Sequence, residues 1–166
     1  MVLITECVAA CIIFSLIIPS VKKNPLAWSY DYPPAIQKRL KALGLVENDK
    51  LILSRPVVVR KLLVSLAAAV LFALLMFFVN GADTFVKGFL YSYAVWLSVT
   101  WYDALVIDCV WFCHDKSIRI KGTEDMLSEY HNYGYHIAAS CKGSLMGIPA
   151  CALAGGITAL LAMIIH

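Results

Sequence analysis

Residues 62–79 (LLVSLAAAVLFALLMFFV) form an apolar run that contains no charged side chain. A helix crosses the roughly 30 Å hydrocarbon core of a bilayer with about 20 mostly apolar residues, and somewhat shorter runs still suffice. A helix on the surface of a soluble domain instead has one apolar face and one polar face, because one side meets water. The run therefore predicts a membrane-spanning helix.

Three further apolar segments predict spans: 3–18, 88–110 and 144–165. Of the 166 residues, 61% are hydrophobic and only 15% are charged, whereas a soluble domain has about 25% charged residues. So few charged side chains cannot cover a surface that faces water. We therefore expect an all-α integral membrane protein with four transmembrane helices, in a single polytopic domain over residues 1–166.

The basic residues predict the orientation of these spans. Residues 19–61 contain nine Lys and Arg against three acids, and residues 111–143 contain four more. Loops rich in Lys and Arg stay in the cytoplasm. The first six residues, MVLITE, carry an acid and no basic residue, and Lys22 and Lys23 follow the first span, which is the reverse of a cleaved signal peptide. We expect a multi-pass protein of the plasma (inner) membrane, with both termini outside and both long loops cytoplasmic.

The first loop predicts a short amphipathic helix at YPPAIQKRLKALGL, which begins with prolines and ends at Gly44. Ile36, Leu40 and Leu43 recur at the spacing of one apolar face. We expect this helix to lie on the inner membrane surface and to direct its basic residues toward anionic lipid headgroups; the alternative is a helix that docks a partner. The basic residues are Lys38, Arg39 and Lys41. An aromatic anchor at the interface is predicted just before them, at Trp28, Tyr30 and Tyr32.

Two carboxylates in the third span are costly at their predicted depth. Asp108 is placed near the cytoplasmic edge, and Asp103 lies about 7 Å deeper. A charge there costs roughly 2.5–3.5 kcal/mol on insertion scales unless it is paired, protonated or hydrated. With α-helical spacing, Asp103 and His114 share a face and Asp108 points about 140° away. Asp103 and His114 therefore suggest a proton or ion path, while bonds to hydroxyls or to Arg60 or Lys61 are the simpler alternative.

The second loop predicts a cytoplasmic helix before the last span. Thr123 is a suitable N-cap, and acids follow it in the first turn. Helical spacing then gives one polar stripe, which either faces water or lines a cleft against the inner end of the third span. The stripe comprises Asp125, Glu129, Asn132, His136 and Ser140.

Several of these side chains carry acid–base or ligand chemistry. A general acid and base can come from partly buried carboxylates and histidines, for which the candidates are Asp108, His114, Glu129 and His136. Nitrogen and oxygen donors also suit a divalent metal, for which the candidates are His114, Glu124, His131 and His136. The chain has no HExxH or comparable metal spacing, so whether a divalent metal binds stays open.

The last span carries a stripe of small residues every four positions. Small side chains let helices approach closely in lipid, where packing replaces the hydrophobic effect. The stripe therefore predicts a helix-packing face, used either inside the bundle or in a homo-oligomer. Its members are Gly143, Gly147, Cys151 and Gly155.

These features are compatible with three functions. The first is a membrane-embedded enzyme with a polar site at the cytoplasmic interface, acting on an amphiphilic or lipid substrate. The second is an oligomeric transporter or channel that uses Asp103 and His114, and the third is an accessory subunit of a membrane complex. The basic residues border the spans, so nucleic acid is not an expected partner.

Overall fold

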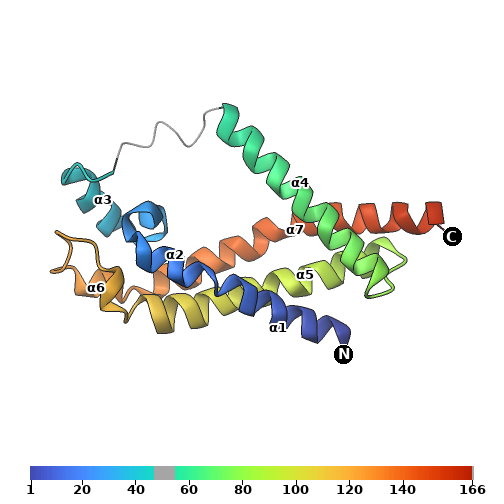
Figure 1. The fold of residues 1–166 in the computed structure, drawn as a ribbon, viewed down its shortest axis with the longest axis horizontal. Helices are drawn as coiled ribbons and strands as arrows, with labels where there is room; N and C mark the ends of the chain where they lie inside the picture. The colour runs from blue at the N-terminus through green and yellow to red at the C-terminus, as the bar shows by residue number, and fades with distance from the viewer. Residues whose placement is uncertain (47–54, 166) are drawn as a thin grey trace.

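The computed structural model describes residues 1–46 and 55–165. Within these ranges the chain is helical and contains no strand. Part of the predicted first loop, 47–54, lies outside the described residues. The helices are α1 (Val2–Phe14), α2 (Ile17–Lys23), the 3₁₀-helix η1 (Pro25–Asp31), α3 (Pro34–Ala42), α4 (Arg55–Phe78), α5 (Phe85–Tyr102), the π-helix η2 (Asp103–Phe112), the 3₁₀-helix η3 (Lys116–Ile118), α6 (Leu127–Tyr130) and α7 (Tyr133–Ile165) (Figure 1).

Three helical stretches of the described chain are long and apolar enough to cross a membrane: Val2–Lys23, Phe85–Phe112 and Leu127–Ile165. The predicted span at 62–79 corresponds to the apolar part of α4, Leu62–Phe78, and ends one residue beyond this helix; the apolar part is shorter than the three stretches above. Large apolar side chains point outward along the helices, and Leu145 and Met163 are 67% and 80% exposed. Such a surface is compatible with a membrane location, where lipid covers it.

The last span is much longer than its apolar run. We predicted a span over 144–165 with a separate helix before it, but α7 is one helix of 33 residues from Tyr133, with Pro149 inside it. The N-cap prediction at Thr123 is wrong, because α6 begins only after Met126. The Thr123 hydroxyl donates instead to the Ile120 carbonyl, 2.7 Å away. The predicted cytoplasmic helix is therefore the short α6 and the start of α7.

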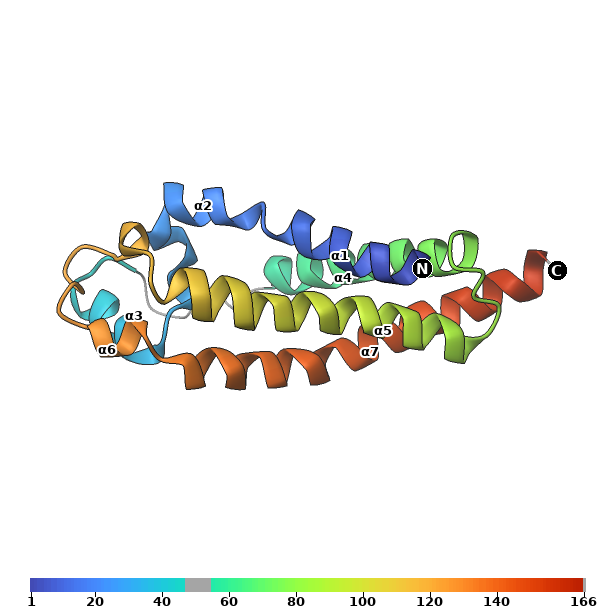
Figure 2. The ribbon, with the colours of Figure 1, turned by 90° about the horizontal axis from the view of Figure 1, so that it is seen from below.

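α5 continues into η2 and runs antiparallel to α7, with α1 and α4 packed against this pair (Figure 2). Glycines bring the helices together. A Cβ on Gly155 would lie 2.7 Å from the Phe85 carbonyl oxygen, and a Cβ on Gly147 would overlap the Trp96 indole. Cys151 is buried. The small-residue stripe of α7 therefore faces α5 within one chain.

A hydrophobic core fills the end of the bundle where the loops lie, which we call the loop end. Ile36 and Leu40 of α3 are fully buried there against Ile118 and Tyr130. The amphipathic helix is thus present, but the second loop, not the bilayer, covers its apolar face. Arg39 pairs with Asp125 at 2.7 Å, while Lys38 is exposed.

Candidate functional site

A cavity of about 970 Å³ opens between α1, α2, η1, α4, the α5–η2 helix and α7. This volume is at the upper end of the range for small-molecule sites. Its walls are mostly apolar, and they extend from Glu6 near the start of α1 to Val21 in α2. Fifteen residues at a rise of 1.5 Å correspond to roughly 22 Å, so the cavity is elongated along the bundle.

The polar groups of the cavity gather toward the loop end. Asp31 comes from the last residue of η1, and Asp103 and Asp108 come from η2. The fourth acid, Glu6, lies near the other end, where it accepts a hydrogen bond of 2.7 Å from Asn80. The cavity therefore has a long apolar part and a head with three carboxylates.

The π-helix η2 places two of these carboxylates on one face. In a π-helix the hydrogen bonds join residues five apart, and the Cys113 amide donates to the Asp108 carbonyl at 2.9 Å in this pattern. Asp103 and Asp108 are five residues apart, and both line the cavity. Our prediction that they face about 140° apart is wrong, because it assumed α-helical spacing.

Asp108 has a buried histidine partner. The His136 Nδ1 lies 3.0 Å from the Asp108 Oδ2, and His136 is only 2% exposed. The His136 ring also packs edge-on against Phe112, with ring centroids 5.4 Å apart. Its Nε2 is buried without a hydrogen-bond partner in the described part of the chain. The pair joins α7 to η2 beside the carboxylates.

Asp31 is exposed by surface area because its side chain borders the open cavity. The surrounding walls nevertheless remove water from its carboxyl, and this desolvation raises the pKa of Asp31 to about 6. The negative charge of Asp108 raises that pKa further, whereas His136 lowers it. The pKa of Asp31 therefore depends on the charges of the other groups at the head of the cavity.

A salt bridge fastens the wall of the cavity at the loop end. The Lys22 Nζ lies 2.8 Å from the Asp115 Oδ2, which also accepts from the Trp111 indole at 2.8 Å. The hydrogen bonds from Lys22 and then from Ser117 hold the pKa of Asp115 well below its usual range. These contacts hold α2 against the end of η2.

The other predicted site residues do not reach the cavity. The His114 Nε2 lies 3.0 Å from the Tyr133 hydroxyl, and the rings of His114 and His131 are 5.1 Å apart. Glu124 accepts from the Gly122 amide at 2.7 Å. His114, Glu124, Glu129 and His131 are all absent from the cavity walls.

The structure therefore joins only part of each predicted set. Asp108 and His136 of the catalytic set meet, whereas His114 lies apart from Asp103 on the predicted path. Among the described residues, no group of three or more His, Cys, Asp or Glu side chains is placed to hold a metal ion. The side chains of Arg60 and Lys61, the alternative partners of the aspartates, lie outside the described residues.

The polar stripe of the second loop divides between two environments. His136 and Ser140 are buried toward the third span, and Ser140 lines the cavity. Asn132 instead accepts from the Tyr135 amide at 3.0 Å, at the start of α7. The cleft alternative thus describes the later half of the stripe.

Sequence reasoning missed Asp31 as a site residue. Its signal was weak: a single acid within the aromatic stretch WSYDY of a basic loop. Trp28 and Tyr30, predicted as an interfacial anchor, line the cavity with it, while Tyr32 is fully buried in the loop-end core.

Comparisons of this chain with protein-family models, with characterised proteins and with solved structures find no match.

Proposed function

We propose that this protein is a membrane-embedded enzyme that acts on an amphiphile. The observation that carries the proposal is the elongated apolar cavity with three carboxylates at its head, one of them paired to a buried histidine. The apolar walls would hold the tail of the substrate, and its polar head would lie among Asp31, Asp103 and Asp108.

The chemistry suited to this head is proton transfer. Two carboxyl groups on one helical face can divide the roles of acid and base, as in other enzymes that use carboxyl pairs. Asp103 and Asp108 are our candidates for these roles. His136 would position Asp108, since its Nδ1 contacts that carboxylate.

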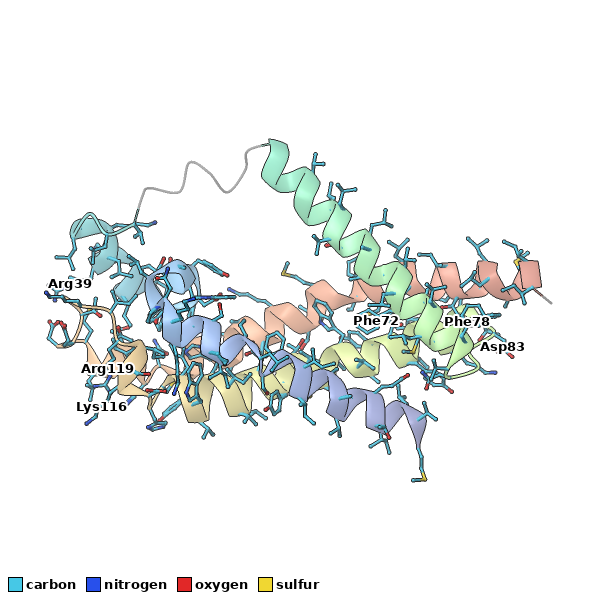
Figure 3. The ribbon with its side chains drawn as sticks, viewed as in Figure 1. Arg39, Phe72, Phe78, Asp83, Lys116 and Arg119 are labelled. Carbon is cyan, nitrogen blue, oxygen red and sulfur yellow. The ribbon has the colours of Figure 1, made fainter. Side chains whose placement is uncertain are left out.

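We also propose four spans, with both loops on the cytoplasmic side. Basic side chains support this orientation: Arg39, Lys116 and Arg119 lie at the loop end, whereas Asp83 lies at the opposite end (Figure 3). The positive-inside rule assigns the basic end to the cytoplasm. The head of the cavity would then lie near the cytoplasmic surface of the plasma (inner) membrane.

A transport path is the second candidate function. Asp103 supports it, because this carboxylate lines a cavity inside the bundle. His114 does not support it, because it lies at the surface against Tyr133. A path in this protein would therefore use Asp103 together with Asp31 and Asp108.

Co-purifying amphiphiles offer a direct test. The protein would be purified in a mild detergent, and the bound molecules extracted and identified by mass spectrometry. Ala139→Trp would fill the cavity, and Ala138→Trp is its matched control, because both alanines are exposed but only Ala139 lines the cavity. We expect the bound amphiphile to be lost in Ala139→Trp alone.

Turnover separates an enzyme from a transporter. The extracted amphiphile would be incubated with the wild type and with Asp108→Asn, and its chemical conversion followed by mass spectrometry. We expect conversion by the wild type only, at amphiphile concentrations that saturate both proteins. Binding without conversion by the wild type would reject the enzyme and favour transport, which a liposome flux assay would then examine.

A further inference from the structure

The charged side chains of the described residues that line the cavity are all acidic. Four acids line it, and no Lys, Arg or His of the described chain does so. The chain as a whole carries a net charge of +3, so this sign is opposite to that of the protein. In a cavity with little water, like charges repel strongly and a ligand of opposite charge is favoured.

The carboxylates at the head also lack cationic partners. Asp103 has no hydrogen bond or ion pair from any described side chain, and Asp108 has only His136. Lys22 of α2 is already paired with Asp115. A bound cation would therefore supply the charge that the described protein does not.

Aromatic rings also line the cavity. Trp28, Tyr30, Trp96, Trp111 and Tyr135 all line the cavity. Aromatic faces attract cations, and cages of such rings recognise amines and quaternary ammonium groups. One of these rings already contacts a cation that does not line the cavity, because the Lys22 ammonium lies 5.7 Å from the centroid of the Trp111 ring.

The arrangement favours an organic cation over a metal ion. A metal requires three or more donors within one coordination sphere, and the described residues offer no such group.

We propose that the cavity binds a long-chain organic cation, with an amine or quaternary ammonium head among the three aspartates and an alkyl chain along the apolar walls. This inference rests on the proposed function and narrows its substrate class. Anionic amphiphiles such as fatty acids are excluded by the same charges.

Three probes with the same alkyl chain test the charge preference: decyltrimethylammonium, decanol and decanoate. Binding to the purified protein in a non-ionic detergent at pH 7.5 would be measured by equilibrium dialysis. We expect decyltrimethylammonium to bind about tenfold more tightly than decanol, since one desolvated charge contact is worth roughly that factor. Decanoate should bind more weakly than either.

Variants locate the effect in the head of the cavity. Asp103→Asn should weaken binding of the cation about tenfold and leave decanol unchanged, whereas Asp103→Glu, which keeps the charge, should retain most of the affinity. Asp125→Asn is the matched control, because Asp125 is exposed and paired with Arg39 outside the cavity. It should change the affinity for none of the probes.

Three results would overturn the inference in different ways. Equal affinities for decyltrimethylammonium and decanol, or a preference for decanoate, would reject a cationic head but leave the amphiphile site in place. Absence of binding for all three probes would reject the amphiphile site as well. A cation preference that survives Asp103→Asn and Asp31→Asn together would place the cation elsewhere and reject the proposed site.

Discussion

The Nδ1 of His136 lies 3.0 Å from the Oδ2 of Asp108, so that one contact joins α7 to the π-helix η2 inside the bundle. His136 is almost fully buried, and the carboxylate that it contacts faces the cavity. The pair therefore links the packing of two helices to the geometry of the candidate site.

Replacement of this histidine should destabilise the protein. His136→Leu leaves the Asp108 carboxylate without its partner, and we expect a loss of about 1–3 kcal/mol in the free energy of unfolding. Thermal unfolding in detergent would measure it. His114→Leu is the control, since His114 is exposed and its one hydrogen bond to a described residue is with the Tyr133 hydroxyl; an equal loss in both variants would contradict the role given to the pair.

The same substitution at two aspartates should act in opposite directions. Asp103→Asn removes a charge that repels Asp31 and Asp108, so we expect a gain of roughly 0.5–2 kcal/mol, as is common when a functional site is neutralised. Asp108→Asn instead weakens the contact with His136 and should destabilise. Unfolding curves of both variants at neutral pH decide this. Destabilisation by Asp103→Asn would mean that its carboxylate has a favourable partner.

Binding of a cation should depend on pH through Asp31. Its pKa is raised to about 6 in the free protein, so this carboxyl becomes neutral as the pH falls from 7 to 5. A bound cation favours the ionised carboxylate, and protons therefore compete with it. We expect the affinity for decyltrimethylammonium to fall over this range.

Other groups at the head contribute to the same pH profile. Asp103, Asp108, His136 and Tyr135 face this region from η2 and α7. Asp31→Asn should therefore flatten the profile in part, with weaker binding at pH 7. A profile that is identical in the wild type and in this variant would exclude Asp31 from the site.

Two glycines of α7 offer a matched test of helix packing. A Cβ at Gly147 would overlap the Trp96 indole, whose Nε1 donates to the Gly143 carbonyl at 3.0 Å, whereas a Cβ at Gly156 meets nothing within 4 Å. We expect Gly147→Ala to cost about 1–3 kcal/mol. Gly156→Ala should be neutral or slightly stabilising, because alanine favours the helix. Equal effects in thermal unfolding would mean that α5 and α7 separate easily.

Two leucines of the amphipathic helix distinguish protein cover from lipid cover. Leu40 is fully buried in the loop-end core, while Leu43 is 47% exposed. We expect Leu40→Ala to destabilise by about 2–5 kcal/mol, as for other buried leucines, and Leu43→Ala to have much less effect. Unfolding in detergent measures both. A negligible effect of Leu40→Ala would favour the bilayer as the cover of α3.

The long apolar runs and the low share of charged residues predicted a helical membrane protein, because a soluble domain could not cover such a chain with polar groups. Asp103 was identified as costly for the same reason. The relative direction of Asp103 and Asp108 was wrong because residue types do not reveal where a helix winds with i→i+5 bonds. The amphipathic pattern of α3 showed which face is apolar, but a pattern does not say whether lipid or another segment covers it.

The head of the cavity was predictable only in part. His136 and Asp108 lie in sequence near other polar residues, and both were selected from their types and positions. Asp31 comes from a distant loop, and only the folding of η1 against η2 and α7 brings it to them. His114 and Glu129 are polar residues of the same part of the sequence, and the sequence did not distinguish them from Asp108 and His136. In the fold they lie away from the cavity.

The winding of η2 also limits how this segment can change in evolution. Five-residue spacing keeps Asp103 and Asp108 on a common side only while the segment stays π-helical. An in-frame loss of one codon between them would leave four-residue spacing, which an ordinary α-helix aligns equally well. A diverged gene could therefore keep the acidic pair with a shorter motif, and an alignment without a gap at this point would pair the wrong residues.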